Sequence, residues 1–150
     1  MTNNIFKNVI NELLVPYGFK KNRNNSWTRK GKEVSMKVYL QKSNFSNLYY
    51  FRSSYILDNM QVESTGDNEC FSDLEFCDYK LLSKMCDLEF DVSDEERIKY
   101  LRELITKDFA NHRYIETEAE LKKVIKQKKY TSISSVKEIF RYRVMKKETY

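Results

Sequence analysis

The strongest constraint on the fold is an uninterrupted alternation of apolar and polar residues from position 34 to position 41. One phase contains Val34, Met36, Val38 and Leu40, and the other contains Ser35, Lys37, Tyr39 and Gln41. Because successive side chains of a strand point to opposite faces, this pattern predicts a strand with one face in a core and one at least partly in water. Such a strand is typical of an antiparallel sheet that is covered on one face.

Neighbouring segments predict a leading helix and further strands. Apolar residues recur at helical spacing from Asn4 to Leu14, and Pro16 and Gly18 follow as helix breakers. Residues 26–30 and the turn at 30–32 predict a hairpin, and the aromatic-rich stretch 48–57 predicts another strand. Between 58 and 84 the pattern gives only a short strand near Gln61 and an irregular acidic segment around 67–78. Alternation from Cys86 to Val92 predicts a last half-buried strand.

Three helix starts follow, at Ser93, Thr117 and Ser135. Ser93 and Glu96 have the spacing of a capping box, in which hydroxyl and carboxylate satisfy each other's backbone amides. The order of helix, strands and helices indicates an α+β fold. We expect an antiparallel sheet of about four strands, with an N-terminal helix and three C-terminal helices packed on one face. Residues 1–150 are expected to form a single domain.

The chain has no apolar run approaching the roughly 18 residues of a membrane span, and its N-terminus lacks the pattern of a secretory signal. We therefore expect a cytoplasmic protein that does not use a membrane. The cysteines at 70, 77 and 86 are odd in number and too widely spaced for the close pairs of zinc sites, so reduced thiols are expected.

Charge is zoned along the chain. Residues 1–57 have ten basic and two acidic residues, 58–112 have six and fifteen, and 113–150 have eleven and five. A zoned surface favours a partner that binds in one orientation, whereas a net charge of +5 speaks only to solubility and non-specific attraction.

Short motifs in the first third of the chain suggest a known family. They are Tyr17-Gly18-Phe19-Lys20-Lys21, the aromatic–basic pair Trp27 and Arg29, the strand end Leu40-Gln41-Lys42-Ser43, and the aromatic strand from Tyr49 to Leu57. Over residues 14–57 the chain resembles a bacterial family known as domain of unknown function 4304. That family usually has a Gly after its third strand, where this chain has Ile56-Leu57-Asp58. The resemblance implies a small cytoplasmic α+β protein of bacterial type, with no catalytic residues to carry over and no named substrate.

Catalysis has little support in the sequence. His112 is the single histidine and falls at a predicted helix end, where an imidazolium interacts well with the helix dipole. No motif places a nucleophile beside it. Cys86 falls in the inward phase of its predicted strand and is expected to be a core residue. A non-enzyme is the expectation, although an unrecognised site stays open.

Cofactor and metal sites are not predicted. The three glycines are too far apart for a phosphate-binding loop. Asp87, Glu89 and Asp91 would share one strand face, but carboxylates at alternate strand positions are about 6.6 to 7 Å apart, too far to share an ion without a loop. A solvated strand face is the better interpretation.

A basic and aromatic set on the predicted sheet is the best candidate for binding. Its members are Lys20, Lys21, Trp27, Arg29, Lys37, Tyr39, Gln41, Tyr50 and Arg52. Basic grooves with stacking aromatic residues bind single-stranded nucleic acids. Equally, Trp27 could fill the core and the tyrosines could cover strand edges, and an acidic strand at 87–91 in the same sheet would repel phosphate.

The sequence therefore favours a non-enzymatic cytoplasmic module that binds another protein, because a catalytic set is missing and zoned charge can orient an interface. Neutralising a toxin, as immunity proteins do, is one concrete version. The alternative is a single-stranded nucleic-acid-binding protein that uses the basic and aromatic sheet face. The sequence leaves the oligomeric state open.

Overall fold

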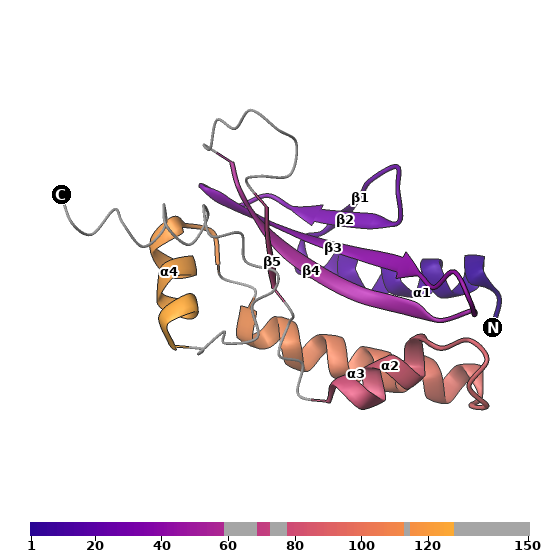
Figure 1. Ribbon diagram of the computed structural model, residues 1–150. Helices are drawn as coiled ribbons and strands as arrows, with labels where there is room; N and C mark the ends of the chain where they lie inside the picture. Colours follow the sequence, from indigo (N-terminus) through magenta and orange to yellow (C-terminus); the bar gives the residue numbers. More distant parts are fainter. Residues whose placement is uncertain (59–68, 73–77, 113–114, 128–150) are drawn as a thin grey trace.

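The computed structural model describes residues 1–58, 69–72, 78–112 and 115–127, and in them the α+β fold is confirmed (Figure 1). The helices are α1 (Asn3–Leu14), the short 3-10 helix η1 (Val15–Tyr17), α2 (Tyr79–Cys86), α3 (Asp94–His112) and α4 (Glu118–Gln127). The strands are β1 (Lys20–Lys21), β2 (Ser26–Arg29), β3 (Val34–Lys42), β4 (Tyr49–Leu57) and β5 (Glu69–Ser72). The strands form one antiparallel sheet in the order β1-β2-β3-β4-β5.

The long hairpin β3–β4 is the centre of this sheet. Its register runs from Val34 opposite Leu57 to Lys42 opposite Tyr49. The inner face of the sheet, which the helices cover, carries the alternating apolar residues Val34, Met36, Val38, Leu40, Tyr49, Phe51, Tyr55 and Leu57. The predicted alternation of β3 is therefore correct, and it leaves every second side chain of β3 and β4 on an opposite, outer face.

Helix α1 packs its apolar stripe on the inner face. Phe6, Ile10 and Leu14 are completely buried, and the Phe6 ring lies 5.1 Å from that of Tyr49. The Thr2 hydroxyl caps the helix by accepting from the Ile5 amide. After η1 the chain turns at Gly18, whose φ of 84° is a left-handed conformation that favours glycine.

The strand predicted from Cys86 to Val92 is wrong. Cys86 ends helix α2, which begins after the N-cap Asp78, and only an isolated bridge joins Asp87 to Leu48. The inward residues Leu82, Met85 and Cys86 have the i, i+3, i+4 spacing of a helix, and this longer period prevails over the short alternation that follows it.

The fold instead places β5 at residues 69–72, inside the segment that the sequence pattern left irregular. Its register pairs Tyr55 of β4 with Cys70. The strand predicted near Gln61 and the helix predicted from Ser135 lie outside the described residues.

Helix α4 docks at the beginning of β3. The Glu116 carbonyl accepts from the Glu33 and Val34 amides at 2.8 and 3.0 Å, and the Glu33 carboxylate accepts from the Glu118 amide at 2.9 Å. A Cβ at Gly31 would overlap the Val34 carbonyl oxygen and lie 2.9 Å from Glu116 Cα. Gly31 is thus required for this close approach.

Candidate functional site

The outer face of the sheet is the candidate site, and we define it by Lys20, Lys37, Tyr39, Gln41, Tyr50 and Arg52. Helices α1, α2 and α3 lie on the other side of the sheet (Figure 1). The register places Gln41 opposite Tyr50 and Tyr39 opposite Arg52, so these four side chains neighbour one another across the central strand pair.

Arg52 is held in place by two of these neighbours. Its Nε donates to Gln41 Oε1 at 2.9 Å, and its guanidinium carbon lies 5.5 Å from the centre of the Tyr50 ring. Lys37 Nζ lies 5.7 Å from the centre of the Tyr39 ring in the same kind of contact. Each cation therefore lies over a tyrosine face within the range of a cation–π interaction.

A neutral polar group borders these pairs. Asn22 Nδ2 donates to Ser26 Oγ at 3.1 Å and to Thr28 Oγ1 at 2.8 Å. Thr28 lies opposite both Lys20 and Lys37 in the register. This group was not identified from the sequence. Asn22, Ser26 and Thr28 are spaced at even intervals, so they share the outward side of β2 and of the loop before it, and this spacing is the signal that could have found them.

Trp27 and Arg29 do not join the outer face. Trp27 is 0% exposed on the inner face, and its Nε1 donates to Asn11 Oδ1 of α1 at 2.9 Å. Arg29 is buried beside the Phe19 ring, 5.4 Å from its centre, and burial lowers the pKa of its guanidinium. Lys21 is exposed but lies opposite Trp27, in the inner phase at the end of the short strand β1.

The candidate catalytic and metal-binding residues do not form a site in the described part of the chain. His112 is the last residue of α3. Cys86 is a buried free thiol, and burial raises its pKa to about 12, so it stays protonated. Among the described residues, no three histidine, cysteine or carboxylate side chains form a cluster that could hold a metal ion.

A groove of about 430 Å³ lies between α1 and α3. Its lining is Val9, Glu12, Leu13, Pro16, Tyr17, Ile98, Arg102 and Thr106. Its polar groups that could take part in acid–base or nucleophilic catalysis are Glu12, Tyr17 and Thr106, and histidine and cysteine are not among the lining residues.

The acidic residues at 87–91 form no strand of the sheet, and only an isolated bridge joins Asp87 to Leu48. They follow α2 in a turn, where the Asp87 carboxylate accepts from the Glu89 amide at 3.0 Å. The repulsion expected from an acidic strand in the sheet is therefore removed, because those residues form no such strand.

Comparison with known proteins gives one family. The model of the family described as domain of unknown function (DUF4304) matches residues 10–127, a longer stretch than the motifs of residues 14–57. No curated protein and no solved structure matches the chain. None of the helices in the described ranges combines the length and apolar composition needed to cross a bilayer.

Proposed function

Because this chain belongs to the DUF4304 family, whose description gives no activity, we propose from the site alone that it is a non-enzymatic binding module for another protein. The outer face is the proposed contact surface. The observation that carries the proposal is the pair of cation–tyrosine contacts on the sheet face opposite α1, α2 and α3, with Arg52 also fixed by Gln41.

Arginine and tyrosine are the residue types that contribute most often to hot spots in protein interfaces. Here both are already ordered by their neighbours, since Arg52 contacts Gln41 and Tyr50 at the same time. Ordering a side chain before binding lowers the conformational entropy lost on association. The outer face is thus suited to binding a partner without rearranging.

The charge of the outer face specifies the partner. The outward positions from Lys37 to Gln41 and from Tyr50 to Arg52 carry no acidic residue. At the other end of the strand pair the Asp58 carboxylate accepts from the buried Ser35 hydroxyl at 2.9 Å. An acidic protein surface would pair with Lys37 and Arg52 and would be steered toward them. The proposal places the protein in the cytoplasm of a bacterial cell, in keeping with its free thiol at Cys86. Neutralising a toxin would be one such role.

Single-stranded nucleic acid is the second candidate. Open basic and aromatic sheet faces bind such strands by stacking bases on the rings. The contacts of Lys37 with Tyr39 and of Arg52 with Tyr50 speak against it, because a stacking base would have to displace the cation that lies over each ring. A protein partner can use the cations where they are.

Affinity purification of the tagged protein from host lysate tests both candidates. We would compare wild type, the outer-face variant Lys37→Glu with Arg52→Glu, and the control Lys107→Glu with Lys123→Glu, which makes the same charge change at exposed positions of α3 and α4. Each sample is divided, one half is treated with nuclease, and bound protein and nucleic acid are quantified.

We expect a stoichiometric protein that survives nuclease, is retained by the control and is lost by the outer-face variant. Bound nucleic acid that disappears on nuclease treatment, shows a steep salt dependence and is lost in the outer-face variant would establish the second candidate instead. Absence of any stoichiometric protein contradicts the proposal.

A further inference from the structure

The end of the molecule formed by the β3–β4 loop and the α2–α3 turn has the opposite character to the outer face. We call it the acidic tip and define it by Phe45, Glu89, Phe90, Asp91, Asp94 and Glu95. Phe45 is 99% exposed in the loop, and Phe90 is 39% exposed in the turn. The carboxylates of the other four residues belong to exposed side chains.

Backbone hydrogen bonds hold the loop and the turn together. The Leu88 amide donates to the Asn47 carbonyl at 3.1 Å, which joins the turn to the loop. Within the loop, the Ser43 amide donates to the Leu48 carbonyl at 2.8 Å and the Phe45 amide donates to Ser43 Oγ at 3.1 Å. Phe45 is therefore displayed on a closed hairpin loop, in a position that a partner could contact.

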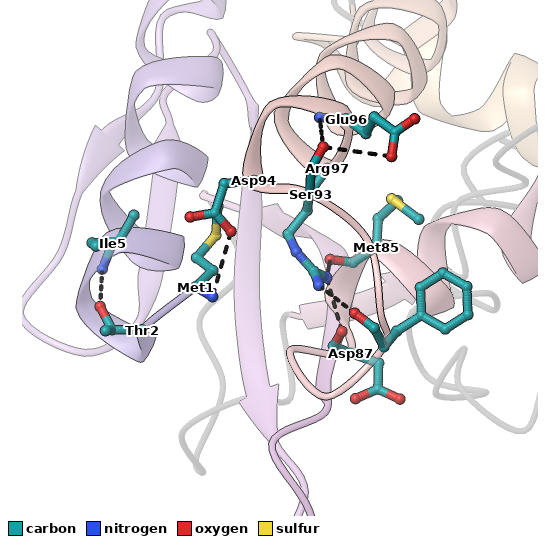
Figure 2. A network of polar contacts seen from close by, with 10 residues as sticks. Met1, Thr2, Ile5, Met85, Asp87, Ser93, Asp94, Glu96 and Arg97 are labelled. Carbon is teal, nitrogen blue, oxygen red and sulfur yellow. Dashed lines mark hydrogen bonds and ion pairs between the residues drawn. The ribbon is translucent and has the colours of Figure 1, made fainter.

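Arg97 of α3 holds the turn through backbone carbonyls, as Figure 2 shows. Arg97 is 1% exposed, and its guanidinium donates to the carbonyls of Met85, Asp87 and Phe90 at 2.7, 2.8 and 2.9 Å. The N-terminal ammonium lies 3.4 Å from Asp94 Oδ1, which ties the start of α3 to the start of the chain. These contacts give the acidic tip a defined shape.

In the described part of the chain, Asp94 is the carboxylate of the acidic tip that pairs with a cation, the N-terminal ammonium. Arg97 is buried among carbonyls, and Lys84 Nζ lies over the Phe90 ring at 5.7 Å. Arg97 and Lys84 thus make other contacts, and Glu89 and Asp91, the sequence neighbours of Phe90, have exposed side chains. An exposed phenylalanine beside carboxylates is complementary to a surface that combines aromatic rings with cations.

The outer face of this same chain is such a surface. We propose that the acidic tip of one copy docks on the outer face of a second copy. Phe45 would pack against the ring edges of Tyr39 and Tyr50, which leaves Lys37 and Arg52 over the ring faces to meet Glu89 and Asp91. The inference rests on the proposed function, since it names a partner for the same surface. A contact between two different patches is heterologous, so it continues into chains or closes into a ring.

Sedimentation of the full chain tests this proposal. Measurements cover concentrations up to about 1 mM, the range of weak association. We expect the sedimentation coefficient of wild type to rise with concentration in about 0.1 M salt and to stop rising in about 1 M salt, because the screening length falls from about 10 Å to about 3 Å. Wild type that sediments as a monomer throughout would overturn the inference.

Two variants identify the surfaces. The outer-face variant Lys37→Glu with Arg52→Glu and the tip variant Phe45→Ser with Glu89→Lys and Asp91→Lys should each sediment as monomers. A mixture of the two retains one intact outer face and one intact acidic tip, so it should form a 1:1 complex and nothing larger. The control Lys107→Glu with Lys123→Glu should associate like wild type, and a mixture that stays monomeric counts against the proposal.

The result is distinguishable from the proposed function. A monomeric wild type that still captures a nuclease-resistant protein through its outer face would reject the second copy as the partner and retain the binding module. A wild type that associates but captures no other protein would retain the second copy and reject a separate partner.

Discussion

Trp27 is a core residue whose sequence neighbourhood suggested a binding residue. Its strand position faces the helices, and the Asn11 amide oxygen satisfies its indole N–H. We predict that Trp27→Phe lowers the free energy of unfolding by about 1 to 3 kcal/mol, because it removes packing volume and a hydrogen bond, while leaving partner binding unchanged. Urea unfolding and the capture assay measure the two effects. Tyr39→Ala is the matched comparison and should reduce capture of the partner instead. Loss of capture by a Trp27→Phe protein that is fully folded would contradict the assignment of Trp27 to the core.

Arg97 is a buried cation that acts through backbone carbonyls. It satisfies three of them at the junction between α2 and α3. We predict that Arg97→Met lowers the free energy of unfolding by about 2 to 4 kcal/mol, since methionine leaves these carbonyls unsatisfied in a buried place. Arg97→Lys should recover only part of the loss, because a single ammonium cannot span all three acceptors. An unfolding free energy for Arg97→Met within about 0.5 kcal/mol of wild type would refute this role.

At the scale of the element, α4 depends on a capping box. Glu120 Oε2 accepts from the amides of Glu116 at 2.7 Å and Thr117 at 3.1 Å, and the Glu120 amide donates to Thr117 Oγ1 at 3.3 Å. The hydrogen bond from the Glu116 backbone is the main cause that lowers the pKa of Glu120 below its usual value of 4.5. A carboxylate with a lowered pKa stabilises the folded state above its unfolded pKa, and this contribution is lost as pH falls through the folded pKa.

We therefore predict that Glu120→Gln is less stable than wild type at pH 6, by about 0.5 kcal/mol, and that the difference disappears well below pH 4.5. Thermal unfolding at both pH values measures it. Glu103→Gln, at an exposed position of α3, is the control for loss of a carboxylate. A difference of equal size at both pH values would exclude the charge of Glu120 as its cause.

At the scale of the whole molecule, one core cluster joins α1, the sheet, α2, α3 and α4. Cys86 lies in it as a buried thiol. In a Cys70→Ser, Cys77→Ser variant, where Cys86 is the single thiol, we predict that iodoacetamide reacts at least about 1,000-fold more slowly than with free cysteine. The rate of reaction of Cys86 with iodoacetamide should be proportional to the fraction of globally unfolded protein, which urea unfolding measures. Fast reaction under native conditions would instead show that α2 opens separately from the rest.

Much of the fold could be predicted from the amino-acid sequence, because it depends on local periodicity. The alternation of β3 and the apolar stripe of α1 each depend on a few neighbouring residues, and each forms as expected. The capping box at Ser93 forms in one half: the Glu96 amide donates to Ser93 Oγ at 3.2 Å, whereas the Glu96 carboxylate accepts from the Ser93 hydroxyl at 3.5 Å. Periodicity puts Lys37, Tyr39 and Gln41 on one side of β3 and puts Tyr50 and Arg52 on one side of β4. The register of the two strands then brings both sets onto the same face.

Tertiary structure decided what periodicity could not. Residues 86–92 alternate like a strand, but Arg97 binds the carbonyls of Met85, Asp87 and Phe90 and holds the chain in a turn there. Trp27 lies in the core because its pairing with β3 and its contact with α1 place it on the inner face of the sheet. The sequence separates the two faces of a strand but does not say which face the helices cover. Contacts between residues distant in the chain, such as Glu33 with Glu118, carry no local signature, so only the folded molecule shows them.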